Sequence, residues 1–217
     1  MPFILISMII LEKTQVMNFE NAMRGARNPM NSWAKSDSTT NTDGTFTFGP
    51  NDLDLAKRLC KSGSDHRKFI RQIFISVDIT APLYWWKEFD TYKVSTVANS
   101  TSTMHKIHTK AFALEDFSTD HMLPQALESM NRIIADLEDL RVEYMKEAVG
   151  GRNKEYWYSM IQLLPSSYNQ KRTVTMNYEN VHNMYFSRKA HKLMEWHTYC
   201  DWILKLPYFS DFFEIEK

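Results

Sequence analysis

Hydrophobic and polar positions in the first quarter of the chain predict a strand, a helix and a long polar loop, in that order. Ile4–Val16 is rich in aliphatic and β-branched residues and favours a strand. Asn18–Arg27 repeats apolar residues at helical spacing. Residues 28–51 are dense in Ser, Thr, Asn, Asp and Gly, which indicates a long loop with a short hairpin around Asp43-Gly44.

The middle of the chain predicts a helix, a strand and an aromatic helix. Asp52–Cys60 again has helical spacing, and Gly63 follows it as a helix terminator. Phe74–Thr80 alternates apolar with polar residues and favours a strand. We expect Ala81-Pro82 to mark the end of that strand or a bend in it, because proline cannot donate to a ladder. Leu83–Phe89 is then expected to be a helix that buries its aromatic surface.

Helices dominate the second half of the pattern. His121–Val149 carries the clearest helical stripe, and Trp157–Leu164 is expected to be a helix that ends before Pro165. Val181–Leu204 predicts two helices with a break near Arg188–His191. Long helices and few strands predict an α/β (α+β) fold, with helices packed around a central sheet in a single compact domain that spans residues 1–217.

Composition and charge narrow the class of protein. The chain has 217 residues, 43% of them hydrophobic, which is typical of a globular domain. Its 26 Lys and Arg balance its 26 Asp and Glu, so the formal net charge is zero. That balance excludes a uniformly basic protein that wraps nucleic acid, and it excludes a polyacidic tail. We expect no nucleic-acid partner.

The cysteines and the first residues indicate a cytoplasmic protein. Cys60 and Cys200 stand alone, so neither a disulfide framework nor a paired metal-ligand motif is expected. Met1–Leu11 is apolar but lacks the basic start and cleavage site of a signal peptide. It is interpreted as a first strand or as an extension upstream of an alternative start at Met8, and no membrane segment is expected.

General catalytic motifs are absent. The sequence has no glycine-rich phosphate loop, no G-x-S-x-G and no H-E-x-x-H. His105 and His108 lack further ligands nearby, so we interpret them as a surface pair and predict no metal site. Ser95–Thr103 holds six hydroxyl residues, which suit a phosphate pocket or an ordinary hydroxyl-rich turn.

A more particular pattern lies in the last third of the chain. Leu164-Pro165 is followed by Thr175-x-Asn177 and then by Asn183, Arg188 and His191. These polar residues cannot all serve a core, so they indicate a bound polar ligand. The pattern resembles the C-terminal signature of the flavin-dependent thymidylate synthases, which runs L-P, T-x-N-x-R, N, arginine and histidine.

Upstream landmarks of the same family follow in order. Arg24-Gly25-Ala26-Arg27 resembles its early R-A-A-R helix, His66 its histidine before the central strand, and Ala81-Pro82 the A-P after it. The resemblance covers Val16 to Leu204. It implies a homotetramer with FAD and dUMP bound at subunit interfaces. It also implies transfer of a methylene group from a folate and reduction by a flavin hydride derived from NADPH, with no protein nucleophile.

The family hallmark R-H-R-x-x-S-x-N-E-x-S-x-R is the part from which the sequence departs. In the aligned window, Thr91–Thr103, only Lys93 keeps a cation among three arginine positions. Ile161 replaces another nucleotide-binding arginine. Glu179 replaces the arginine of T-x-N-x-R, where a carboxylate would repel the flavin pyrophosphate unless a neighbour such as Arg172 or Lys171 compensates.

The resemblance assigns candidate site residues by ligand. FAD is expected at His66, Asn177, Asn183 and His191. The pyrimidine nucleotide is expected at Glu88, Lys93, Thr96, Thr101 and Arg188. Tyr92, in place of the family histidine, and Lys93 are the residues expected nearest the reacting atoms.

Three hypotheses remain open on the sequence. The first is a divergent flavin-dependent methyltransferase of the thymidylate synthase type, which acts by one-carbon transfer and reduction at C5 of a pyrimidine nucleotide. The second is a non-catalytic homologue that serves as a nucleotide-binding or protein-interaction scaffold, as would suit a phage or mobile-element protein. The third is an unrelated helical domain, in which Asn177, Asn183 and Arg188 would not share a pocket.

Overall fold

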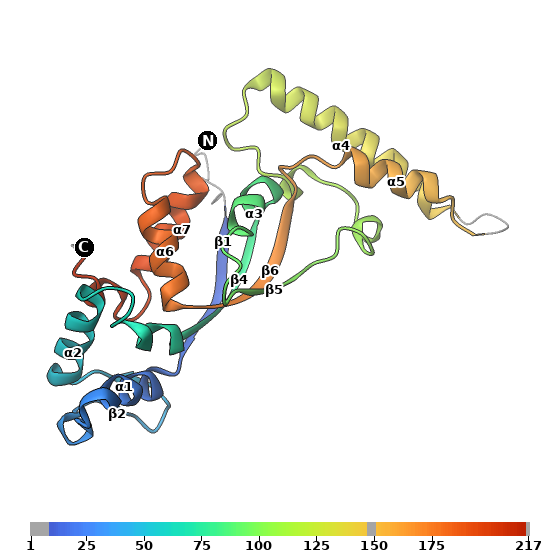
Figure 1. The fold of residues 1–217 in the computed structure, drawn as a ribbon. Helices are drawn as coiled ribbons and strands as arrows, with labels where there is room; N and C mark the ends of the chain where they lie inside the picture. The colour runs from blue at the N-terminus through green and yellow to red at the C-terminus, as the bar shows by residue number, and fades with distance from the viewer. Residues whose placement is uncertain (1–8, 147–150, 216–217) are drawn as a thin grey trace. The chain divides into compact units, whose positions relative to one another are not determined.

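The computed structural model of the chain describes residues 9–146 and 151–215 (Figure 1). The expected strand positions before residue 9 and Val149, the expected end of the long helix, lie outside the described residues. The chain divides into two compact units. One includes Ile79–Thr91 and Asn99–Arg172, and the other includes Leu11–Asp78, Tyr92–Ala98 and the chain from Thr173 onward. The expected single-domain boundary, residues 1–217, stays a prediction.

The second unit begins with elements that the sequence predicted. Strand β1 spans Ile10–Met17, helix α1 spans Phe19–Arg27 and helix α2 spans Pro50–Lys61. In the loop between the helices, strands β2 (Thr39–Thr40) and β3 (Phe46–Thr47) pair antiparallel around the turn at Asp43-Gly44, where Gly44 has φ +83°. The expected hairpin is therefore confirmed.

Asp37 and Asp52 order this polar loop. The Asp52 carboxylate is fully buried, pairs with Arg27 at 2.5 Å and accepts hydrogen bonds from the hydroxyls of Ser36 and Ser38. The Asp37 carboxylate accepts the backbone N–H groups of Asn51 and Asp52 in the first turn of α2. A Cβ atom at Gly49 would lie 2.3 Å from Cγ of Asp37, so this close approach requires glycine.

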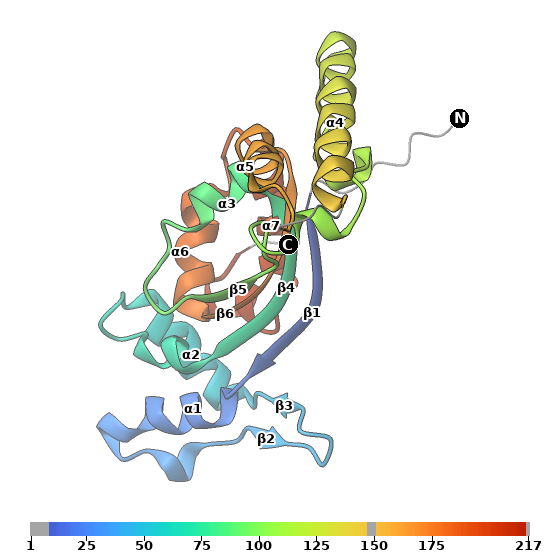
Figure 2. The same ribbon diagram turned by 90° about the vertical axis from the view of Figure 1, so that its right-hand side faces the viewer.

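The central sheet has four strands in the order β1-β4-β6-β5 (Figure 2). Strand β4 spans Phe74–Pro82 and ends at the expected proline. Strands β6 (Asn169–Asn177) and β5 (Val97–Ser100) were not predicted from the sequence. In β6, Val174 and Met176 are buried while Thr173 and Thr175 are exposed, which is the alternation of a half-buried strand.

The C-terminal part of the second unit is a pair of helices packed on β6. Helix α6 spans Tyr178–Arg188 and α7 spans Met194–Leu204, so the expected break between two helices is confirmed. The hydroxyl of Tyr199 on α7 is buried and donates to Sδ of Met176 and of Met184, each at 3.4 Å. Helix α8 (Phe209–Phe212) follows.

The first unit contains α3 and a pair of long helices. Helix α3 spans Leu83–Phe89, as expected, and α4 (Pro124–Met145) begins at the expected first-turn proline. Helix α5 spans Lys154–Leu163, so it begins three residues before the expected start and ends before Pro165. The apolar core of the first unit consists of Ile107, Phe112, Phe117, Met130, Leu137 and Met160.

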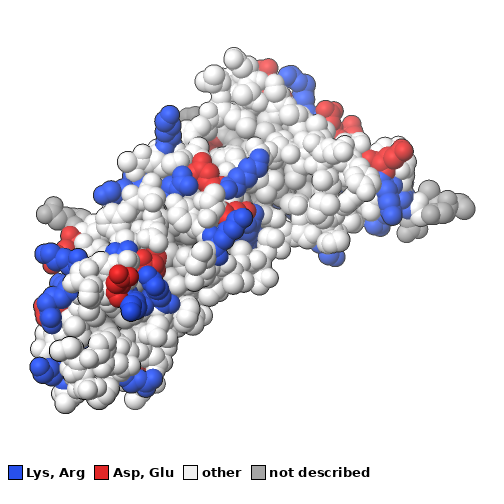
Figure 3. Space-filling model, viewed as in Figure 1, with Lys and Arg blue, Asp and Glu red and all other residues white. Residues whose placement is uncertain are grey.

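Short 3₁₀ helices complete the described chain. They are η1 (Asn28–Met30), η2 (Trp33–Lys35), η3 (Lys68–Gln72), η4 (Ile107–Thr109) and η5 (Leu114–Asp116). Acidic and basic side chains are interspersed on the face drawn in Figure 3. Within the described ranges, no helix has the length and apolar character needed to cross a membrane.

Candidate functional site

Three predicted site residues gather around one tryptophan in the second unit. Arg188, the last residue of α6, donates from Nε to the hydroxyl of Tyr92 at 3.0 Å. Its guanidinium carbon lies 4.8 Å from the ring centre of Trp196 and 5.6 Å from that of Tyr92. The rings of Tyr92 and His191 each lie 6.2 Å from the Trp196 ring. The cluster therefore combines a stacked cation with two aromatic residues and an imidazole.

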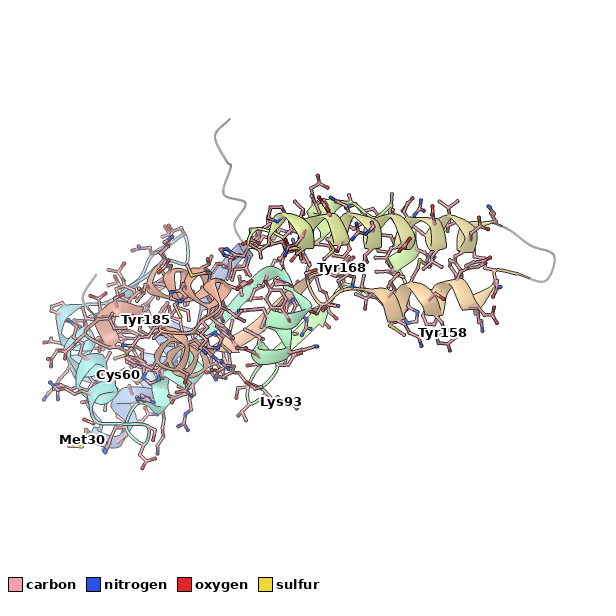
Figure 4. All side chains as sticks on the ribbon, turned by 90° about the horizontal axis from the view of Figure 1, so that it is seen from above. Met30, Cys60, Lys93, Tyr158, Tyr168 and Tyr185 are labelled. Carbon is pink, nitrogen blue, oxygen red and sulfur yellow. The ribbon has the colours of Figure 1, made fainter. Side chains whose placement is uncertain are left out.

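The segment Tyr92–Ala98 is fixed to α6 at a second point. Nδ2 of Asn180 donates to the backbone oxygen of Val94 at 2.7 Å, and Ser95 takes a left-handed conformation with φ +59°. The hydroxyl oxygen of Thr96 is buried and has no hydrogen-bond partner among the described residues. Lys93 is exposed (Figure 4). This segment thus offers a free cationic side chain to solvent and a buried polar atom that lacks a partner.

Asn177 has a structural role in the chain itself. It is the N-cap of α6: its side-chain oxygen accepts the N–H of Asn180 at 3.0 Å, and the Asn180 side chain accepts the N–H of Asn177 at 3.1 Å. Asn177 is only 4% exposed. This reciprocal cap explains why an amide side chain suits the junction of β6 and α6. A cofactor contact at Asn177 stays a prediction.

The other expected flavin residues differ in their surroundings. His66 is exposed and belongs to the turn before η3. Asn183 is exposed on α6, where its side-chain oxygen lies 3.0 Å from Nδ1 of His182. Nδ1 of His191 accepts the N–H of Leu193 at 3.1 Å, which fixes the ring proton of neutral His191 on Nε2.

Glu179 is neutralised by residues that the sequence did not indicate. Arg67 donates to its carboxylate from Nε and from Nη2 at 3.1 and 2.9 Å, and both side chains are nearly buried. Arg71 is a second cation, 3.9 Å from the same carboxylate. The expectation that Arg172 or Lys171 would compensate is wrong for Arg172, which instead binds Asp90 at 2.7 Å and lies over the Trp86 ring.

Two expected nucleotide residues belong to the first unit. Glu88 is half-buried on α3. Thr101 has an exposed side chain, and its backbone bonds to β6 through Lys171 and Gln170. Among the replaced arginine positions, Ile161 packs against the apolar core of this unit, and the Thr91 hydroxyl donates to the backbone oxygen of Glu88 at 2.7 Å.

Two cavities lie away from these residues. A cavity of about 430 Å³ in the first unit is lined by Tyr84, residues 118–122, Met130 and residues 165–167. A cavity of about 820 Å³ in the second unit is lined by residues 16–21, by the β2–β3 hairpin, and by Pro207, Tyr208 and Asp211. None of the predicted site residues lines either cavity. Among the described residues, no three His, Cys, Asp or Glu side chains gather as a metal site.

Trp196 and Arg67 are the components of the site that sequence reasoning missed. Trp196 follows His191 by five residues, and its pattern is that of any core tryptophan on a helix. Arg67 directly follows His66, so the sequence predicted a site residue at position 66 but not the arginine beside it. Its partner, Glu179, is 112 residues away, and no local pattern connects the two.

The fold is that of the flavin-dependent thymidylate synthases. Two solved structures of thymidylate synthase X (ThyX) from Helicobacter pylori, both with FAD and dUMP, align with TM-scores of 0.66 and 0.67. Each is 16% identical to this chain, and the alignments cover 95% of this chain and 96% and 97% of theirs. No protein-family model and no curated protein matches the sequence. The expected resemblance and α/β fold class are thus confirmed.

Proposed function

We propose that this chain is a divergent protein of the flavin-dependent thymidylate synthase type. It binds FAD and a pyrimidine nucleotide, and it transfers and reduces a one-carbon group at C5 of the pyrimidine. The observation that carries the proposal is the fold match over 95% of the chain to structures that hold FAD and dUMP. NADPH and a methylene folate are its co-substrates, and a cytoplasmic homotetramer is its assembly.

The stacked cation supports nucleotide binding. Arg188 is held by Trp196 and by the Tyr92 hydroxyl, so its planar guanidinium loses little freedom when it meets a phosphate. In this proposal Arg188 and Lys93 bind the nucleotide phosphate, with Glu88 and Thr101 as further substrate residues. Tyr92 positions Arg188 and lies nearest the reacting atoms.

The orphaned hydroxyl of Thr96 supports a bound polar ligand. A buried hydroxyl without a partner costs about 1–3 kcal/mol, which a ligand donor or acceptor would recover. His66, Asn177, Asn183 and His191 would hold the flavin, and they do so by hydrogen bonds rather than by charge. FAD, when bound, supplies the hydride. The chain itself contributes binding, orientation and electrostatic stabilisation, without a nucleophile.

A non-catalytic scaffold is the second candidate function. It is favoured by the replacement of family arginines with Thr91, Thr103 and Ile161. Ile161 and Thr91 also have structural roles, in the core and in the turn after α3, so neither position retains a ligand group. Such a homologue would bind a nucleotide or a protein without turnover, as would suit a phage or mobile-element protein.

The test combines flavin uptake with nucleotide binding and activity. Purified protein is titrated with FAD by absorbance and flavin fluorescence, and with dUMP by calorimetry. The proposal expects FAD uptake and a yellow protein, and Arg188→Gln should weaken dUMP binding without removing the colour. Rescue of a thymidine auxotroph would exclude the scaffold. Colourless protein that takes up no FAD would overturn the proposal and leave the scaffold.

A further inference from the structure

The ion pair of Arg67 with Glu179 has an unusual charge balance. Glu179 lies in the first turn of α6, and its side chain is 14% exposed. Arg67 engages it in a fork, with Nε and Nη2 both donating, and its own side chain is 15% exposed. Such forked pairs fix the plane of the guanidinium as well as its position. Arg67 is therefore held in one orientation.

Arg71 adds a second positive charge to the same carboxylate. Its Nε lies 3.9 Å from Oε2 of Glu179, and its side chain is 49% exposed. Two guanidinium groups and one carboxylate sum to a local charge of +1. A lone arginine at position 179 would give the same sum. The substitution to Glu179 therefore leaves this position with a net positive charge, supplied from η3 and the turn before it.

The location adds to this positive character. The cluster lies at the start of an 11-residue helix, whose first-turn N–H groups carry partial positive charge. Glu179, in the first turn of α6, offsets part of the partial positive charge of these N–H groups. Arg71 is half-exposed, so it is the cation of the cluster that an incoming anion can reach. Arginine is well suited to phosphate, because its fork can match two phosphate oxygens. Since Glu179 engages Nε and Nη2 of Arg67, the fork open to a phosphate is that of Arg71, and Arg67 adds its charge and its Nη1 group.

We infer that Arg67 and Arg71 are the cations that bind the phosphate groups of the dinucleotide cofactor in this chain, with Glu179 as the positioning residue of Arg67. The inference rests on the proposed function, because it takes FAD as the ligand. It adds a charge swap, by which we mean that the positive charge at the start of α6 comes from Arg67 and Arg71 and not from the residue at position 179. These two arginines are far from Glu179 in the sequence.

The experiment compares FAD with riboflavin, which has the same ring system but no phosphate. Affinities are measured by quenching of flavin fluorescence on the full chain. Arg71→Gln and Arg67→Gln should each weaken FAD binding about five- to tenfold and leave riboflavin binding within twofold. The reversed pair Arg67→Glu/Glu179→Arg should bind FAD within about twofold of wild type. Arg132→Gln, which removes a charge from an exposed site on α4, is the matched control.

The outcomes separate this inference from the proposed function. If the wild type takes up no FAD, both fail. If it binds FAD but the ratio of FAD to riboflavin affinity is unchanged in Arg71→Gln and Arg67→Gln, only the charge swap fails. A purely structural role would lower both affinities alike. Arg71 is half-exposed, so Arg71→Gln should fold even if Arg67→Gln does not, and its thermal midpoint is measured beside each titration.

Discussion

The Nε atom of Arg188 donates to the hydroxyl of Tyr92 at 3.0 Å, and this bond joins the end of α6 to the segment Tyr92–Ala98. From the sequence, Tyr92 is expected to replace the histidine of the R-H-R hallmark. The tyrosine hydroxyl accepts a hydrogen bond from Nε of Arg188, whereas a charged histidine would repel the guanidinium. Tyr92 is thus an internal partner for Arg188, the residue that we propose binds the nucleotide.

Tyr92→Phe tests this partnership. The variant keeps the ring but removes the acceptor, so the free energy of unfolding should fall by about 1 kcal/mol. Affinity for dUMP should fall about three- to tenfold, because Arg188 loses part of its orientation. Urea unfolding and calorimetry measure the two effects. Tyr158→Phe, at a site 55% exposed on α5, should change neither quantity. Unchanged dUMP affinity in Tyr92→Phe would contradict the positioning role.

Asn177 offers a way to separate capping from cofactor binding. Asn177→Ala should lower stability by about 1 kcal/mol, because the N–H of Asn180 loses its acceptor. Asn177→Ser keeps a capping oxygen and should recover most of that loss. If the amide also binds flavin, both variants should weaken FAD binding alike, despite their different stabilities. Thermal melts and FAD titration on the same samples provide the comparison.

Asp52 should make stability depend on acid pH. Burial alone would raise the pKa of Asp52, but hydrogen bonds from Ser38, Ser36 and Arg27 outweigh burial and hold it below its ordinary value of 3.8. The carboxylate therefore stabilises the fold fully above the unfolded pKa. That contribution is lost as the pH falls through the lower, folded pKa.

The comparison of Asp52→Asn with wild type isolates this effect. At neutral pH the variant leaves Arg27 buried without its charge partner, which should cost about 3–5 kcal/mol. The difference between the two proteins should begin to shrink as the pH falls below the ordinary value of 3.8, because the unfolded wild type then takes up a proton first. It should close as the folded carboxylate is protonated at a still lower pH. Melts by circular dichroism between pH 3 and 7 measure it. Asp54→Asn, which breaks only the exposed pair with Arg58, should cost less than about 1 kcal/mol.

The two cysteines should be inert in the folded protein. Cys60 and Cys200 are both buried and free, and burial raises the pKa of each thiol to about 12. Since the thiolate is the reactive form, a disulfide reagent at pH 8 should label neither residue in native protein and both in guanidinium chloride. Rapid labelling of native protein would show that one of the thiols is accessible.

The sequence predicted the elements in which a local period determines the structure. Leu83–Phe89 forms a helix at the expected bounds, and the Asp43-Gly44 hairpin forms in the expected loop. Strand β6 was not predicted, although Thr173–Met176 alternates polar with apolar residues, because Thr175 and Asn177 also fit a ligand-binding motif. Strand β5 has four exposed residues and no alternation, so no pattern could have indicated it.

The candidate site depended on pairs that are distant in the sequence. Arg188 was predicted from a motif, but its stacking on Trp196 and its bond to Tyr92 depend on how α6, α7 and the segment Tyr92–Ala98 pack. Likewise, the charge of Glu179 could be read locally, while its partner Arg67 comes from another part of the chain. The local sequence pattern therefore showed that position 179 lacks the positive charge of an arginine, but it did not show that Arg67 and Arg71 lie beside Glu179.

The reciprocal bonds of Asp37 and Asp52 also determine how the long polar loop responds to proteases. Its composition is that of a linker, and Lys35 within it is exposed and would attract trypsin. However, the loop is fastened on both sides of Lys35, by Arg27 before it and by Ser36, Asp37 and Ser38 after it. Cleavage at Lys35 would require these bonds to open together. We therefore expect the buried Asp52 carboxylate to slow proteolysis of a segment whose composition alone is typical of an easily cleaved linker.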